Sequence, residues 1–333
     1  MGSNTIFPEV SIIIPTYNKS ALAIETLNSI ASQSYDNWEC IIVDDGSTTE
    51  DFTALESFAK LDKRFSLFKR PLNTKKGANA CRNYGLSISK GDYIQFFDSD
   101  DVMLENCLKG RVKAIEATTL DFVVFSMGIY HNDGFKNDDT PDVKVNDWKT
   151  ALGEFIGERR LPWNLQRTLY RALLIKERLL FNENLSRFQD VEFNIKLLSQ
   201  LKPKFKIFNK IDCVYRRANS NNPRNKSFNK HVFHSMPIFL ESIHTQIPVD
   251  ILEQKRGNMQ LWLLNLIGLY ADNSVEKSQL NKVICVAEGK LHLNSKQKII
   301  LKLLFLSKTK LKGIKGVVRL NSYLRKKYLK LMA

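Results

Sequence analysis

The residues best suited to chemistry form an acidic loop, Asp98-Ser99-Asp100-Asp101, which directly follows the apolar run Tyr93–Phe97. Carboxylates placed where a buried strand ends are costly unless a cation neutralises them. Oxygen ligands with room for water suit Mg²⁺ or Mn²⁺, which bind through one or two carboxylates and the phosphates of a substrate. The loop therefore predicts a divalent-metal site. The alternative is an acidic turn that only caps a helix or faces solvent.

Two earlier apolar runs also end in polar residues, one in Pro15–Asn18 and the other in Asp44–Ser47. In an open α/β sheet, ligands bind beyond the carboxyl ends of the strands. Pro15 and Tyr17 offer a stacking surface for a nucleobase, and Asp45 offers a partner for its edge. For Asp45 the alternative is turn chemistry, because Asp-Gly-Ser is also a good turn.

The polar residues that follow these apolar runs must be positioned by the strands and helices that the sequence predicts. The run Val10–Ile14 is typical of a buried parallel strand, and further strands are expected at Trp38–Val43, Phe65–Phe68, Tyr93–Phe97, Phe122–Met127 and Phe205–Tyr215. Helices are expected at Ser20–Gln33, Phe52–Leu61, Gly77–Ile88 and Val102–Ala117, through most of 151–200, and beyond Phe228. This order predicts an α/β protein with a doubly wound mixed sheet and a C-terminal helical region. The polar stretch 131–147 predicts a loop or an exposed hairpin.

Length and cysteine content narrow the class of protein. The 333 residues can form one large α/β domain and a smaller appendage. The five cysteines are odd in number and scattered, which argues against a disulfide framework and a zinc site. The N-terminal residues lack a signal-peptide pattern, and no apolar run is long enough to span a bilayer. We therefore expect a cytoplasmic protein.

The net charge of +15 is concentrated near the C-terminus, where residues 289–333 hold 13 Lys or Arg and no Asp or Glu. Basic residues interleaved with apolar ones favour an anionic membrane surface over a nucleic-acid groove. We predict that residues 296–333 place the protein peripherally on the inner face of the cell membrane, and that it binds no nucleic acid. The alternative is a helical bundle with a solvated basic face. Residues 230–290 predict a buried helix that can support a homodimer.

Five stretches, in order and spacing, resemble family 2 glycosyltransferases with the GT-A fold: Val10–Asn18, Ile41–Ser47, Ala80–Gly85, Gly91–Asp101 and Gln189–Phe193. The resemblance implies inverting transfer of a sugar from a nucleotide donor to a saccharide or lipid-linked saccharide in bacterial surface glycan synthesis. It also implies a catalytic domain at 1–228, with a donor-binding half at 8–127 and an acceptor-side half at 128–228. The helical region then covers 229–333.

The resemblance assigns roles in donor binding. Asp45 lines up with the family's uracil-binding aspartate, which implies a UDP-sugar. Arg82 resembles an arginine that contacts the base or the phosphates, and its alternative is a surface salt bridge. Asp100 matches the ligand of Mn²⁺ or Mg²⁺, and Asp98 matches a residue on the ribose hydroxyls or a metal-bound water.

Arg216 and Arg217 resemble the segment that closes the donor site, where arginines can bridge the diphosphate. Asp101 is expected to cap the helix that follows it. The predicted donor and metal residues are Pro15, Thr16, Tyr17, Asp45, Arg82, Asp98, Ser99, Asp100, Arg216 and Arg217.

On the acceptor side, Asp190 matches the general base that deprotonates the attacking hydroxyl. The family usually shows Glu-Asp here, whereas this chain has Gln189 before Asp190. Glu192 is a weaker acceptor-side candidate, and for both acids the alternative is a helix N-terminal residue favoured by the macrodipole. Trp163 and Asn164 resemble the acceptor segment, where an aromatic face can stack on a sugar, although Trp163 can equally be core.

Two other classes of function stay open from the sequence. A sugar nucleotidyltransferase shares a nucleotide-binding α/β domain and an acidic metal site, but it should open with a Gly-rich loop and a basic residue, which Pro15–Asn18 lacks. A non-enzymatic membrane-surface module with a degenerate nucleotide site would use the basic segment, but it leaves Asp98, Asp100 and Asp190 unexplained.

Overall fold

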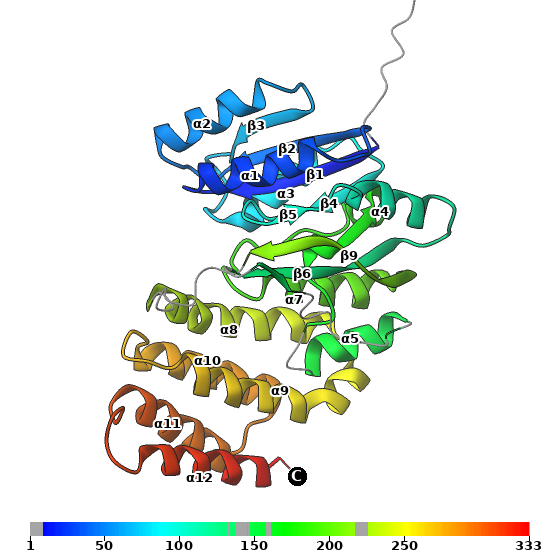
Figure 1. Ribbon diagram of the computed structural model, residues 1–333. Coiled ribbons are helices and arrows are strands. Elements are labelled where there is room, and N and C mark those ends of the chain that lie inside the picture. The colour runs from blue at the N-terminus through cyan, green and yellow to red at the C-terminus, as the bar shows by residue number, and fades with distance from the viewer. Residues whose placement is uncertain are drawn as a thin grey trace, which may run out of the picture. The chain divides into compact units, whose positions relative to one another are not determined.

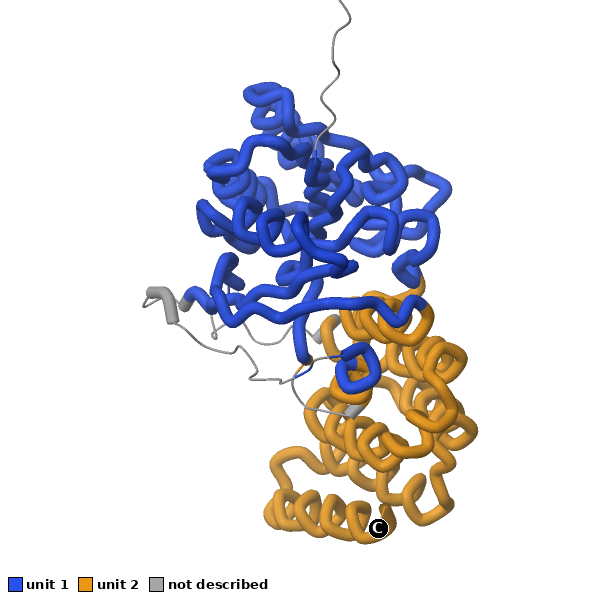
Figure 2. Tube along the Cα trace, turned by 90° about the vertical axis from the view of Figure 1, so that its right-hand side faces the viewer, with its two compact units in different colours: residues 1–151, 162–183, 201–221 blue, residues 152–161, 184–200, 222–333 orange. Residues whose placement is uncertain are grey.

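Figure 1 shows the computed structural model, which describes residues 9–131, 134–136, 145, 147–157, 161–216 and 226–332. The chain divides into two compact units, coloured separately in Figure 2. Unit 1 comprises residues 1–151, 162–183 and 201–221, and unit 2 comprises residues 152–161, 184–200 and 222–333. The first unit contains the β-sheet, and the described part of the second is helical.

Unit 1 is built on one mixed sheet. Its strands are β1 Val10–Thr16, β2 Trp38–Asp44, β3 Phe65–Lys69, β4 Tyr93–Phe96, β5 Val102–Met103, β6 Phe122–His131, β7 Gly134–Lys136, β8 Thr168–Arg171 and β9 Phe205–Arg216. The order across the sheet is β3-β2-β1-β4-β8-β6-β9-β5, and β7 pairs with β6. Strands β3, β2, β1 and β4 are parallel, and β8 is antiparallel to both of its neighbours. The predicted α/β class is confirmed.

Helices cover both faces of the parallel strands. They are α1 Ser20–Ala31, α2 Thr49–Ala59, α3 Ala78–Ile88, α4 Cys107–Glu116 and α6 Ala172–Ile175, with a 3₁₀ turn at Leu165–Arg167, and α5 Trp148–Gly157 runs from unit 1 into unit 2. On β2, Cys40 and Ile42 join the core formed with α1, α2 and α4, whereas Ile41 and Val43 pack with α3. Because successive strand residues face opposite sides, a strand covered on both faces is apolar throughout.

Two stretches of unit 1 differ from the prediction. The helix expected over Val102–Ala117 begins only at Cys107, because Val102 and Met103 pair with β9 as a short strand. The block 151–200, expected to be mostly helical, contains β8 between β4 and β6. A four-residue central strand is too short to show a period of its own. In the predicted loop or hairpin at 131–147, β6 and β7 pair antiparallel, and residues 132–133, 137–144 and 146 lie outside the described residues.

Unit 2 confirms the helical C-terminal region. Its elements are α7 Gln189–Lys196, a π-helical turn at Leu197–Leu201, α8 Lys226–Gln246, α9 Val249–Tyr270, α10 Lys277–Leu291, α11 Ser295–Thr309 and α12 Val317–Lys330. Helix α8 packs on α7 and α10, and α11 packs on α9 and α12. Leu263, Leu264 and Ile267 of α9 have no exposed surface, as expected for a buried helix, while the homodimer stays a prediction. Within the described residues, every helix is too short or too polar to cross a bilayer.

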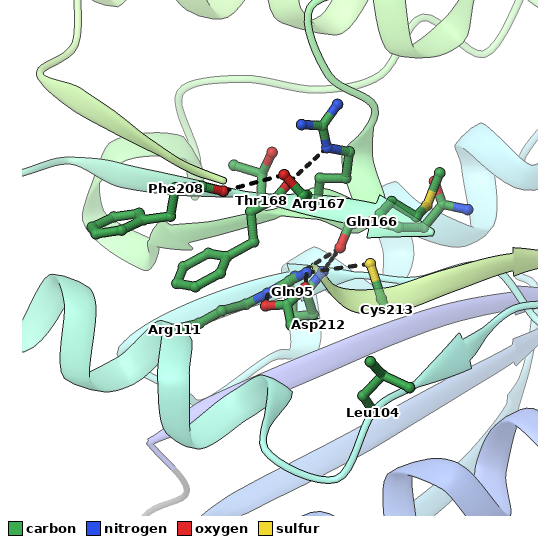
Figure 3. Close-up of polar contacts among 12 residues, drawn as sticks. Gln95, Leu104, Arg111, Gln166, Arg167, Thr168, Phe208, Asp212 and Cys213 are labelled. Carbon is green, nitrogen blue, oxygen red and sulfur yellow. Dashed lines mark hydrogen bonds and ion pairs between the residues drawn. The ribbon is translucent and has the colours of Figure 1, made fainter. Parts of the chain in front are cut away.

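A fully buried ion pair joins α4 to β9 (Figure 3). Arg111 donates from Nε and Nη2 to the two carboxylate oxygens of Asp212, at 2.8 and 2.7 Å. Its Nη1 donates to the side chain of Gln95 on β4 and to the backbone carbonyl of Gln166, at 2.7 Å from the carbonyl oxygen. Buried charges persist only where such a set of partners is complete. The arginine therefore ties α4, β9, β4 and the 3₁₀ turn into one unit.

We predict that Asp212→Asn lowers the free energy of unfolding by about 3 to 5 kcal/mol, because it leaves the charge of Arg111 buried without a counter-ion. Urea unfolding followed by circular dichroism measures this loss. The control Glu56→Gln breaks the exposed Lys60–Glu56 pair and should cost less than about 1 kcal/mol. Losses of the same small size in both variants would contradict the role of the buried pair.

Candidate active site

The carboxyl ends of the parallel strands meet at one edge of the unit 1 sheet. Thr16 of β1 is level with Asp44 of β2, and β4 runs parallel to β1 on its other side. The segments that follow these strands therefore leave the sheet at the same edge. As predicted, this topology places Tyr17, Asp45 and the acidic loop at that edge.

Asp45 is buried and held by two donors. Its Oδ1 accepts hydrogen bonds from Arg70 Nε at 2.6 Å and from the backbone N–H of Gly77 at 3.0 Å. The turn bonds come instead from Asp44, whose Oδ2 accepts the backbone N–H groups of residues 46 and 47 at 3.0 Å each. The side chain that stabilises this turn is therefore that of Asp44, and the side chain of Asp45 binds Arg70 and Gly77 instead. Arg70 was not among the predicted residues, although it directly follows the parallel strand β3 and ligands bind beyond the ends of such strands.

At the end of β1, Pro15 and Thr16 are buried, whereas Tyr17 is 44% exposed. The ammonium group of Lys76 lies 3.9 Å from the centroid of the Tyr17 ring. An exposed ring beside a cation can stack with a nucleobase. Thr16 Oγ1 is a buried hydroxyl without a hydrogen-bond partner in the described structure.

The carboxylates of the acidic loop have different partners. Asp98 Oδ1 pairs with Arg82 Nη2 at 2.7 Å, and Asp98 Oδ2 accepts from Gln166 Nε2 at 2.9 Å. Asp100 Oδ2 pairs with Lys19 Nζ at 2.6 Å. Arg82 is buried, so its ion pair is not the surface salt bridge that the sequence left open. The side chains of Asp98 and Asp100 are 38% and 35% exposed and reach solvent.

Asp101 has a different environment from its neighbours. It is 1% exposed and accepts hydrogen bonds from the side chain of Gln166 and from the backbone N–H of Arg216, the latter at 2.9 Å. Burial, and secondly the charge of Asp98, raise the pKa of Asp101 to about 8. The prediction that Asp101 caps a helix is wrong, because β5 follows it and the N-cap of α4 is Asn106.

Arg216 ends β9 and reaches the acidic loop through its backbone. Its side chain pairs with Glu25 of α1, so a contact with a diphosphate stays a prediction. Arg217, predicted beside it, lies outside the described residues. Ser99 is buried within the loop, and its predicted donor contact also stays a prediction.

Asp98 and Asp100 fit a Mg²⁺ or Mn²⁺ ion, because they are two partly exposed carboxylates with hard oxygen ligands. The described part of the chain has no group of three or more His, Cys, Asp or Glu side chains placed to hold a metal. An ion here would take its other ligands from water and from the phosphates of a substrate.

The sequence predicts that Trp163 stacks on an acceptor sugar, and the structure contradicts this prediction. Trp163 has no exposed surface, and its ring packs on Phe122 and Phe205 with centroids 5.9 and 5.3 Å apart. The core alternative is therefore correct. The neighbouring Asn164 is half-buried with Nδ2 3.7 Å from Met127 Sδ, and its acceptor role stays a prediction.

Asp190 and Glu192 both lie in the first turn of α7, in unit 2. The acceptor role of Glu192 is wrong, because the side chain is 1% exposed and packs against α8. Its Oε1 accepts from Ser242 Oγ at 2.7 Å, and its Oε2 lies 3.2 Å from Lys196 Nζ. Asp190 is only half-buried, and its role as general base stays a prediction.

Comparisons with known proteins point to one family. The model of the glycosyl transferase family 2 matches residues 11–180, half of the chain. An uncharacterized glycosyltransferase of Rickettsia bellii is 39% identical over 114 residues, which cover 34% of this chain and 16% of that protein. Glycosyltransferase GlyG of Streptococcus pneumoniae is 33% identical over 123 residues, which cover 37% of this chain and 39% of GlyG. The matches therefore span well under two thirds of these relatives.

A solved structure extends the likeness to nearly the whole chain. The crystal structure of residues 1–349 of S. aureus TarS with UDP-GlcNAc superposes with a TM-score of 0.61. The match covers 97% of this chain and 88% of that chain, at 18% sequence identity. At this identity the likeness concerns the fold alone, and it confirms the predicted GT-A fold with a helical C-terminal region.

We predict that Trp163→Leu lowers the free energy of unfolding by about 2 to 4 kcal/mol, because it removes part of a ring buried between Phe122 and Phe205. The control Leu173→Ala changes a side chain that is 88% exposed and should cost less than about 0.5 kcal/mol. Urea unfolding followed by circular dichroism compares the two variants. Unchanged stability of the Trp163 variant would contradict its assignment to the core.

Proposed function

Because this chain belongs to glycosyl transferase family 2, we propose that it transfers a sugar from a UDP-sugar to a hydroxyl of a saccharide or lipid-linked saccharide, with inversion. We infer a role in bacterial surface glycan synthesis. The observation that carries the proposal is the gathering of Asp45, Arg82, Asp98 and Asp100 at one edge of the unit 1 sheet. These side chains, suited to a nucleotide and to a metal ion, lie beyond the ends of parallel strands, which supports the proposal because open α/β sheets bind ligands there.

The base site suits uracil. Arg70 and Gly77 both bind Oδ1 of Asp45, which leaves Oδ2 to accept the N–H of a base. Uracil presents this N–H between two carbonyl groups, and one of them can accept a hydrogen bond from Nη2 of Arg70, whose Nε and Nη1 donate to Asp45, Pro71 and Thr74. The exposed ring of Tyr17 supplies the stacking surface.

The diphosphate site combines cations with carboxylates. Lys19 and Arg82 form ion pairs with Asp100 and Asp98 of the acidic loop. In this proposal the same two cationic side chains also donate hydrogen bonds to phosphate oxygens of the donor. The charge of the departing diphosphate would be offset by Mn²⁺ or Mg²⁺ held by Asp100 and assisted by Asp98. Arg216 and Arg217 complete the donor site in this proposal.

The transfer step uses a base on the acceptor side. The acceptor hydroxyl attacks the anomeric carbon opposite the diphosphate, and the carboxylate of Asp190 takes the hydroxyl proton. The new glycosidic bond forms as the bond to the diphosphate oxygen breaks, which inverts the anomeric centre. Asp190 stands in this role because of the family resemblance.

We further propose that residues 296–333 attach the protein peripherally to the inner face of the cell membrane. Ile299, Leu303 and Leu306 are exposed on α11 among many lysines, which supports contact with an anionic interface. Ile300 and Leu304 of the same helix are buried, so the segment also packs as a helical bundle. The helical-bundle alternative therefore describes the buried face of this segment, and we propose membrane contact for the exposed face.

Asp100→Ala should weaken UDP binding about tenfold or more in the presence of Mn²⁺, because it removes the principal metal ligand. Binding in EDTA should change much less. Isothermal titration calorimetry measures both constants. The control Asp92→Ala removes an exposed carboxylate at the opposite end of β4 and should bind like the wild type. Equal Mn²⁺ dependence in the wild type and Asp100→Ala would exclude Asp100 as a ligand.

Asp190→Asn should keep donor binding and lose transfer by about 10²- to 10⁴-fold, the usual contribution of general-base catalysis. Transfer is measured as release of UDP from UDP-sugars with lipid-linked acceptors, and binding is measured by calorimetry. Glu241→Gln, which changes an exposed carboxylate on α8, should leave both unchanged. A wild-type rate in Asp190→Asn would show that another group accepts the proton.

A further inference from the structure

Unit 2 contains a basic pocket of about 590 Å³ that the proposed transfer reaction does not use. It is lined by the ends of α9 and α11, the loop 312–316 and the start of α12, and we call it the α12 pocket. Lys308, Lys312 and Lys315 line it together with one acid, Asp272. Three lysines around one cavity favour an anionic ligand.

The backbone at the start of α12 adds to this preference. Gly313 and Gly316 both have φ of +91°, a left-handed conformation that other L-residues rarely adopt. Gly316 is the N-cap of the 14-residue helix and has no side chain to cap the first turn, in which the N–H of Val317 donates to the backbone carbonyl of Ile314 at 3.2 Å. Uncapped N–H groups and the helix dipole attract anions such as phosphate.

A buried acceptor in the wall of the pocket points independently to a ligand. Asn229 is 7% exposed, and its Nδ2 donates to Asp272 Oδ2 at 2.6 Å, which fixes the orientation of the amide. Its Oδ1 is buried without a hydrogen-bond partner in the described structure. Such an acceptor costs free energy unless a donor reaches it. A ligand hydroxyl would satisfy it.

The rim of the pocket is apolar and exposed. Leu269, Ile314 and Val318 all line the pocket and are 61%, 56% and 84% exposed. Large apolar side chains beside lysines are typical of a surface that enters the membrane interface while its cations meet headgroups. A free phosphate ester does not need such a rim.

We propose that the α12 pocket binds the headgroup of an anionic phospholipid that carries a phosphate and a hydroxyl group. The phosphate lies among Lys308, Lys312 and Lys315 at the start of α12, the hydroxyl donates to Asn229, and the apolar rim enters the interface. This inference rests on the proposed membrane attachment and names its site. It does not depend on the donor site of unit 1.

The test compares two triple variants of the full chain with equal net charge. Lys308→Gln/Lys312→Gln/Lys315→Gln changes the pocket, and Lys230→Gln/Lys277→Gln/Lys282→Gln changes exposed lysines of unit 2 that lie outside both the pocket and residues 296–333. Flotation with vesicles of phosphatidylcholine, with and without phosphatidylglycerol, measures partitioning. The pocket variant should lose about 100-fold in partitioning to phosphatidylglycerol vesicles, and the control less than about threefold. Equal losses would indicate diffuse charge attraction and overturn the pocket.

A third variant, Ile314→Ser/Val318→Ser, distinguishes a lipid from a soluble ligand. Both side chains are exposed, so the fold should tolerate the change. Loss of vesicle binding in this variant supports the lipid, whereas unchanged vesicle binding together with calorimetric binding of glycerol 3-phosphate to the wild type would identify a soluble phosphate ester and overturn the lipid. UDP titration of the same variants should match the wild type. Absent UDP binding in the wild type would count against the proposed transfer reaction alone.

Discussion

The Arg111–Asp212 ion pair is connected to the acidic loop through Gln166. The backbone carbonyl of Gln166 accepts from Arg111 Nη1 at 2.7 Å and from Gln95 Nε2 at 3.1 Å. The side chain of the same residue donates to Asp98 and Asp101. A buried charge requires its partners to stay in fixed positions. The loop that carries the candidate metal ligands is therefore held by an ion pair that includes none of them.

This connection explains how several carboxylates can share one loop. Asp98 and Asp100 each have a cationic partner, Arg82 and Lys19, and both remain partly exposed. Among the described residues no cationic side chain pairs with Asp101, which is buried, and burial together with the charge of Asp98 raises its pKa. The loop therefore holds two kinds of carboxylate. Asp98 and Asp100 reach solvent and can exchange their ion pairs for a bound metal ion, whereas Asp101 is buried in the interior. Such separation by environment is a common feature of active sites.

The parallel strands were predictable because both of their faces are covered. A run such as β2 is apolar throughout, and the polar residues after it mark the edge where ligands bind. The strand β8 was not predictable, because four residues without flanking turn signals do not distinguish a strand from a helix. For the same reason Gln166 was missed, since its position beside the acidic loop depends on β8 entering the sheet between β4 and β6.

Among the candidate site residues, the sequence predicted the position correctly only for those that lie just beyond the end of a strand. Asp45 and Asp98 follow from this rule, and Arg70 would have followed from it as well. Trp163 and Glu192 were assigned from local likeness alone, and both are buried by elements distant in sequence, Phe205 in one case and α8 in the other. Local pattern does not show which neighbours the fold brings to a side chain.

We propose that the edge of the unit 1 sheet binds a uridine nucleotide together with a divalent metal. The most direct test is calorimetric titration of the wild-type protein with UDP, GDP and dTDP, each in Mn²⁺ and in EDTA. We expect UDP to bind most tightly and Mn²⁺ to strengthen its binding. Absence of binding for all three nucleotides, or the same affinity in Mn²⁺ and in EDTA, would contradict it.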